Sequence, residues 1–140
     1  LDEKVSHFPE ISGYGFEFTM RLPRRQPATA PPDWCLRLLA DLAARMRGGA
    51  DFGPGDWIVT PHPIGGEAAN APLTGLAITH DPQLPRVDTP NGSADFLTVV
   101  GLTSAEAEAA QQAGEVDSIL RDLREQDPLL VTDPSRPGVR

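Results

Sequence analysis

Residues 87–103, with the sequence VDTPNGSADFLTVVGLT, decide the class of fold that this chain adopts. The pair Asn91-Gly92 lies between two stretches of β-forming residues, 87–89 and 96–102. Asn-Gly is the strongest short signal for a β-hairpin, because both residues tolerate a positive φ. We therefore expect at least one antiparallel pair of strands.

Helices and further strands are expected on both sides of this hairpin. Thr103 and Glu106 have the spacing of a capping box, which predicts a helix that ends near Ala113. The other expected elements are strands over 16–22, 57–60, 76–79 and 129–132, a loop over 61–72, a helix that begins at 31–33 and ends at Gly48-Gly49, and a helix around 116–123 that ends at Asp127-Pro128. This order predicts an α/β (α+β) domain, a mixed β-sheet with packed helices.

Two apolar stripes are expected to pack on each other. In the first strand, apolar and polar residues alternate, so one face carries Phe16, Phe18, Met20 and Leu22. In the first helix, apolar residues recur at helical spacing and form one stripe, Cys35, Leu38, Leu39, Leu42 and Met46.

The length and composition favour one cytoplasmic domain. The 140 residues suit a single domain over 1–140, and we expect the tail, 134–140, to be mobile. No apolar stretch is long enough to span a membrane, and no signal peptide is visible. The single cysteine, Cys35, cannot form an internal disulfide, which favours the cytoplasm.

The net charge of −8 disfavours nucleic-acid binding, because that requires Lys and Arg to displace phosphate counterions. An acidic surface favours a basic partner. We therefore expect neither a nucleic acid nor a membrane among the partners.

The residues that carry chemistry do not form a recognisable catalytic or metal site. His7, His62 and His80 lack further ligands at zinc-site spacing, and no G-x-S-x-G motif is present. The glycines in residues 12–15 precede a strand, whereas a dinucleotide-binding motif follows one. We therefore expect no catalytic residue, metal or cofactor.

Polar and aromatic residues on expected loops are the candidates for binding another protein. They are Tyr14, Asp56, Trp57, His80 and Asp81. Aromatic rings beside acids supply both apolar area and orientation, as binding hot spots do. The alternative is that the rings close the ends of the core.

Four segments, in order along the chain, resemble the suppressor of fused (SUFU) domain family. They are 12–22 (SGYGFEFTMRL), 31–34 (PPDW) with the following helix, a segment from 79–83 (THDPQ) through Thr89-Pro90 and Phe96-Leu97 to 100–103 (VGLT), and 130–133 (LVTD). The resemblance covers nearly the whole chain. The chain resembles a bacterial single-domain member of this family.

The resemblance implies a mixed α/β fold and no enzymatic activity. In this family the animal two-domain member restrains Hedgehog signalling by holding Gli transcription factors, and some bacterial relatives are proposed to be immunity proteins that neutralise toxins. An Asp of the animal protein that contacts the Gli peptide matches Asp56, which would place Asp56 near a binding surface.

The chain departs from the family pattern at its beginning. Members carry an upstream helix and strand, whereas only residues 1–11 precede the Ser-Gly-Tyr-Gly motif here. We expect either a truncated chain or a sheet that lacks a strand. A missing strand would leave an exposed sheet edge through which a homo-oligomer could form.

Three classes of function remain to be separated. The first is a non-catalytic module that binds another protein, either a toxin or a regulatory partner. The second is an enzyme with an unrecognised site, and the third is a structural subunit of a larger assembly. The sequence does not name the partner.

Overall fold

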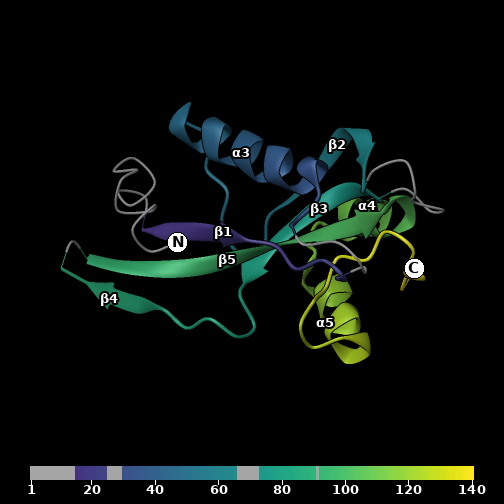
Figure 1. The fold of residues 1–140 in the computed structure, drawn as a ribbon. Helices are drawn as coiled ribbons and strands as arrows, with labels where there is room; N and C mark the ends of the chain where they lie inside the picture. Colours follow the sequence, from purple (N-terminus) through teal and green to yellow (C-terminus); the bar gives the residue numbers. More distant parts are fainter. Residues whose placement is uncertain (1–14, 25–29, 66–72, 91) are drawn as a thin grey trace.

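The computed structural model describes residues 15–24, 30–65, 73–90 and 92–140 of the chain. In sequence order its elements are β1 (Phe16–Thr19), α3 (Asp33–Arg47), β2 (Trp57–Ile64), β3 (Leu73–His80), β4 (Val87–Thr89), β5 (Gly92–Thr103), α4 (Ser104–Ala113) and α5 (Asp117–Gln126). Figure 1 shows them as a twisted sheet with α3 on one side and α5 on the other.

The sheet is mixed and has the long strand β5 at its centre. The strands are ordered β1-β5-β3-β2, and β4 pairs with the first residues of β5. β1 runs parallel to β5, whereas β3 and β4 run antiparallel to it, as β2 does to β3. The expected fold, a mixed sheet with packed helices, is therefore confirmed.

The hairpin predicted from Asn-Gly is present. Thr89 pairs with Gly92, whose φ of 120° is easily reached only by glycine. The second strand of the hairpin begins at Gly92 rather than at Phe96, so β5 is longer than expected.

Alternate residues of β5 face two separate apolar clusters. Val99 faces α3 in a cluster with Leu42 and Leu76. Val100 and Leu102 point the other way, into a larger cluster with α4 and α5, completed by Ala77, Ala110, Val116, Ile119, Leu120, Leu123 and Leu130. The period of two along a strand thus builds a three-layer domain, helix–sheet–helix, from one central strand.

The expected contact between the first strand and the α3 stripe is confirmed in its central part. Phe18 and Met20 pack with Leu38 and Leu39 around the α3-side cluster. β1 ends at Thr19, however, so Met20 and Leu22 lie beyond the strand that was expected to contain them. Phe16 meets Phe18 edge to face, with ring centroids 5.2 Å apart.

The buried thiol of Cys35 belongs to the same layer. Its sulfur lies 3.7 Å from the sulfur of Met20, and burial raises the pKa of the thiol. A raised pKa keeps the group protonated and unreactive at neutral pH.

Capping chemistry sets the start and the end of α4 as the sequence predicts. The amide of Glu106 donates to Thr103 Oγ1 over 3.2 Å, and the amide of Thr103 donates to Glu106 Oε1 over 2.9 Å. Gly114 ends the helix in the left-handed conformation, with φ of 72°. The helix therefore begins directly where β5 stops.

The strand expected over 129–132 is absent. The Asp127 carboxylate accepts the amides of Leu129 and Val131, at 3.1 and 3.0 Å, so local bonds replace a strand ladder. Leu130 has a φ of 55°, which a strand does not allow. The prediction failed because Asp127 competes for the backbone donors.

The loop expected over 61–72 is also partly wrong, because β2 continues to Ile64. Its pairing with β3 shifts register between Val59 and Ile64, around Pro61 and Pro63. Proline lacks the amide donor and is tolerated at sheet edges and bulges, which explains how β2 continues past these residues. Residues 66–72 lie outside the described residues.

None of the helices in the described ranges is long and apolar enough to cross a membrane.

We predict that Leu42→Ala destabilises the domain by about 2–5 kcal/mol, because Leu42 is buried in the α3-side cluster and its loss leaves a cavity. Leu36→Ala on the same helix is the matched control, because Leu36 is 52% exposed and should change stability by less than about 0.5 kcal/mol. Urea unfolding of both variants measures the difference. Equal losses would show that the wrong face of α3 has been assigned to the core.

Candidate partner-binding site

The structure brings four of the five predicted binding residues to one end of the sheet. Asp56 directly precedes Trp57, the first residue of β2. Asp81 directly follows His80, the last residue of β3, which is the antiparallel neighbour of β2. The two segments are bonded to each other, because the amide of Ile78 donates to the carbonyl of Asp56 over 2.9 Å. Tyr14, the fifth residue, lies outside the described residues.

Asp56 lies on a turn that its own side chain stabilises. The amide of Gly53 donates to Asp56 Oδ2 over 2.7 Å, and the amide of Asp56 donates back to the Gly53 carbonyl over 3.1 Å. Gly55 occupies the left-handed region, with φ of 92°. The carboxylate is nevertheless exposed, so a fixed turn presents an acid to solvent.

Trp57 serves the core as well as the surface. Its ring is half-buried and packs against the cluster formed with α4 and α5. The alternative that the ring closes the end of the core therefore describes part of its role, and only part of the ring is left for a partner.

Asp81 is buried in a network of donors. Its side chain is 0% exposed and accepts hydrogen bonds from both terminal nitrogens of Arg21, each over 2.8 Å. Thr19 Oγ1 donates over 2.6 Å, and the amides of Gln83 and Leu84 donate over 2.8 and 2.9 Å. Burial alone would raise the pKa of Asp81, but the bonds from Arg21, Thr19 and the two amides hold it far below its ordinary value.

We call this network of Asp81, Arg21, Thr19, Gln83 and Leu84 the Asp81 corner. It joins the end of β3 to β1 and to the chain after it. Both carboxylate oxygens accept hydrogen bonds within the domain, so the geometry disfavours a direct contact between Asp81 and a partner. The role of Asp81 in partner binding stays a prediction from the sequence.

Sequence reasoning missed Arg21 and Thr19. The polar alternation of 17, 19 and 21 along the first strand was visible, and it places these side chains on one face. Nothing in that alternation indicates that Asp81, 60 positions away in the chain from Arg21, is the acceptor.

The N-terminus of α5 adds acids to the same end of the sheet. A Cβ atom on Gly55 would lie 3.9 Å from Asp117 Oδ1, so Asp117 borders the turn that presents Asp56. Glu115 accepts the amide of Ser118 over 2.9 Å and contributes a further carboxylate near the start of this helix. His80 is exposed.

The described residues contain no group of three or more His, Cys, Asp or Glu side chains that could hold a metal ion. A cleft of about 200 Å³ lies between α3 and β2, with an apolar floor that includes Leu42, Ile58 and Leu76 and a rim that includes Asp41 and Arg45. Of the predicted binding residues that the structure describes, Asp56, Trp57, His80 and Asp81, none lines this cleft.

The fold and the site define a three-layer α/β domain with a mixed sheet and a polar, loop-built surface at one sheet end. The chain belongs to the suppressor of fused family, because the model of the Suppressor of fused protein (SUFU) family matches residues 1–137. The family resemblance seen in the sequence is thereby confirmed.

Curated relatives are much longer than this chain. The Suppressor of fused homologs of human and mouse are each 35% identical to it over 115 residues. The match covers 79% of this chain but only 23% of the length of each relative.

Two solved structures share the fold. The crystal structure of Drosophila Suppressor of Fused is 31% identical, with a TM-score of 0.73, over 89% of this chain and 32% of that chain. The Sufu-Fu complex crystal structure gives 31% identity and a TM-score of 0.75, over 89% of this chain and 57% of that chain. A relative of this domain therefore forms a complex with another protein.

We predict that Asp81→Asn destabilises the domain by roughly 3 kcal/mol at neutral pH, because it leaves Arg21 without its anionic partner in a largely buried site. Asp51→Asn, which changes an exposed carboxylate, should have an effect within about 0.5 kcal/mol. Chemical denaturation of the two variants separates them. A small loss for Asp81→Asn would mean that the corner does not stabilise the fold.

The low pKa of Asp81 also predicts a pH dependence of stability. Its stabilising effect is present above the unfolded-state pKa of roughly 3.9 and is lost as the pH falls toward the lower folded-state value. Between pH 7 and pH 3 the wild-type protein should therefore lose more unfolding free energy than Asp81→Asn. Parallel curves for the two proteins would contradict this assignment.

Proposed function

We propose that this chain is a non-catalytic domain that binds another protein through the end of the sheet where β2 begins and β3 ends. The observation that carries the proposal is the exposed carboxylate of Asp56 on a turn that is fixed by its own hydrogen bonds. Trp57 and His80 lie at the same end and supply partly exposed ring surfaces. A rigid acid beside rings has the composition of a binding hot spot.

The charges of this surface indicate a basic or amide-rich partner segment. Asp56 and Asp117 border the same turn, and the whole chain carries a net charge of −8. Opposite charge on a partner would speed association and orient the complex. The Sufu-Fu complex supports the general mode, because a chain 31% identical to this one binds another protein.

The identity of the partner is a separate part of the proposal. This chain spans 23% of the curated relatives, so their partners do not transfer to it as a whole. We propose a cytoplasmic role with either a regulatory protein or, if the chain is bacterial, a toxin that it neutralises as an immunity protein. Expressing the captured partner in a cell, with and without this chain, distinguishes the two. A toxin stops growth when it is expressed alone and does not when this chain is co-expressed, whereas a regulatory protein has no such effect.

Two rival functions make different predictions. An enzyme would turn over a substrate without a stoichiometric complex. A structural subunit or a homo-oligomer joined through a sheet edge would give a larger species without any second protein. Light scattering of the purified chain tests the oligomer directly, and Pro61 and Pro63 disfavour pairing along β2 because they remove edge donors.

We predict that Asp56→Asn weakens binding to the captured partner by about tenfold and that Asp56→Arg weakens it more, because charge is first removed and then reversed. Asn keeps an oxygen that can accept the Gly53 amide, so the turn should persist. Capture from lysate of the native host, identification by mass spectrometry and calorimetry with the purified partner measure the effect.

The matched control is Asp88→Asn, which removes an exposed charge on the β4–β5 hairpin. Its affinity should equal that of the wild-type protein. Unchanged affinity in both Asp56 variants, with unchanged circular dichroism, would remove this end of the sheet as the binding surface.

A further inference from the structure

The chain after α5 forms an irregular segment that crosses the domain. We call residues 130–139 the strap. It has no helix or strand, and in Figure 1 it runs in yellow from α5, past the chain that follows β1, toward α4. The sequence predicted a strand at its start and a mobile tail at its end. Mobility of residues 134–140 stays a prediction, but the contacts below restrain them.

The strap lies beside β5 beyond the last described residue that β1 pairs with. β1 pairs with β5 only over 95–98. Farther along β5, the amide of Gly101 donates to Thr132 Oγ1 over 2.9 Å, and Arg136 Nη2 donates to the Gly101 carbonyl over 2.9 Å. Side chains of the strap therefore satisfy backbone groups that a neighbouring strand would otherwise pair.

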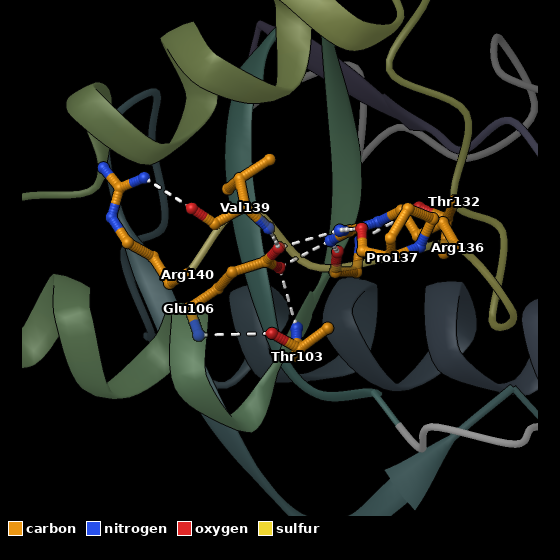
Figure 2. A network of polar contacts seen from close by, with 8 residues as sticks. Thr103, Glu106, Thr132, Arg136, Pro137, Val139 and Arg140 are labelled. Carbon is orange, nitrogen blue, oxygen red and sulfur yellow. Dashed lines mark hydrogen bonds and ion pairs between the residues drawn. The ribbon is translucent and has the colours of Figure 1, made fainter.

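A buried carboxylate on α4 holds the far part of the strap, as Figure 2 shows. The side chain of Glu106 is 0% exposed, and that of Arg136 is 11% exposed. Arg136 Nη1 donates to Glu106 Oε2 over 2.7 Å, and the Val139 amide donates to the same oxygen over 2.9 Å. Burial alone would raise the pKa of Glu106, but bonds from Arg136, Thr103 and Val139 lower it, so the pair is ionised.

The near part of the strap is closely fitted and strained. Leu130 has a φ of 55°, an unfavourable conformation for a residue with a Cβ, and its side chain is buried with only 2% exposed. A Cβ on Gly101 would lie 2.6 Å from Leu73 Cδ1 and 2.8 Å from Thr132 Cγ2, so glycine leaves room at this position for both side chains. The local bonds to Asp127 and the burial of the Leu130 side chain together hold this conformation.

The strap is bonded directly to the Asp81 corner. The amide of Thr132 donates to the carbonyl of Arg21 over 2.7 Å. The guanidinium of the same Arg21 makes both short bonds to Asp81, which follows His80 in the chain. A continuous series of hydrogen bonds thus runs from the Glu106–Arg136 pair, through the strap, to the end of the sheet that carries the candidate site.

We propose that the strap is a displaceable latch: the Arg136–Glu106 pair holds it against β5, and its release loosens the Asp81 corner. The consequence for partner binding rests on the proposed function, but the latch itself does not. A segment held by a few side-chain bonds and strained at Leu130 opens at lower free energy than the paired strands. Release of the strap would break the bond from the Thr132 amide to the Arg21 carbonyl. The Arg21 side chain would still bind Asp81, but its backbone would no longer be held by the strap.

Hydrogen exchange of single amides in the isolated chain tests the latch without any partner. The variant is Arg136→Gln, and the control is Arg140→Gln, which breaks a pair with Asp122 that is about one-third exposed on both sides. In Arg136→Gln we expect exchange to rise at least about tenfold at the amides of Thr132 and Val139. The amides of Gln83 and Leu84, which bond to Asp81, should also exchange faster, whereas α3 should keep its protection.

The outcomes separate the two parts of the proposal. Faster exchange in the strap with unchanged Gln83 and Leu84 would overturn the link to the corner, and unchanged exchange in both would overturn the latch. If Arg136→Gln does not fold, Thr132→Val keeps the side-chain shape while removing the acceptor of the Gly101 amide, and the same amides are measured. A chain that captures no partner would reject the proposed function and leave the exchange result to decide the latch.

Discussion

The domain depends on the pairing and the two-sided packing of β5. This one strand pairs with β1, β3 and β4, and its successive residues Val99 and Val100 enter clusters on opposite faces of the sheet. A shift of one residue in its register would turn Val99 and Val100 to the opposite faces and disrupt the packing of both clusters. The hairpin at Gly92 fixes one end of the strand, and the capping box at Thr103 fixes the other.

Polar networks complete what the β5 pairing leaves open. Beyond the reach of β1, Thr132 and Arg136 satisfy Gly101, while Asp81 ties the end of β3 to Arg21. Both networks centre on a carboxylate with no exposed side-chain surface, and such a group is stable only when donors surround it. The candidate site therefore has a rigid, polar support behind its exposed residues.

Much of this arrangement could be predicted from local patterns. The Asn-Gly hairpin, the Thr103–Glu106 cap and the α3 stripe each depend on residues within a few positions of one another, and each is present. The expected strand at 129–132 failed because Asp127 captures two backbone amides, a competition that propensity alone does not resolve. The candidate residues Asp56 and Trp57 were identified by composition and by family resemblance, whereas the adjacent Asp117 was missed because it is distant in the sequence.

The sequence by itself determined most of the described elements, their order and the mixed character of the sheet, because turn signals, caps and hydrophobic periods act over short distances. The order of four segments along the chain indicated the family. Only the tertiary structure decided which charges are buried and which face solvent. Asp56 and Asp81 resemble each other as acids beside a ring, yet one lies exposed on a turn and the other is enclosed by Arg21 and Thr19. The same holds for Glu106, whose partner Arg136 is 30 residues away. A buried charge needs hydrogen-bond donors, and here they come from residues that are distant in the sequence. A local sequence pattern therefore does not show which charges are buried.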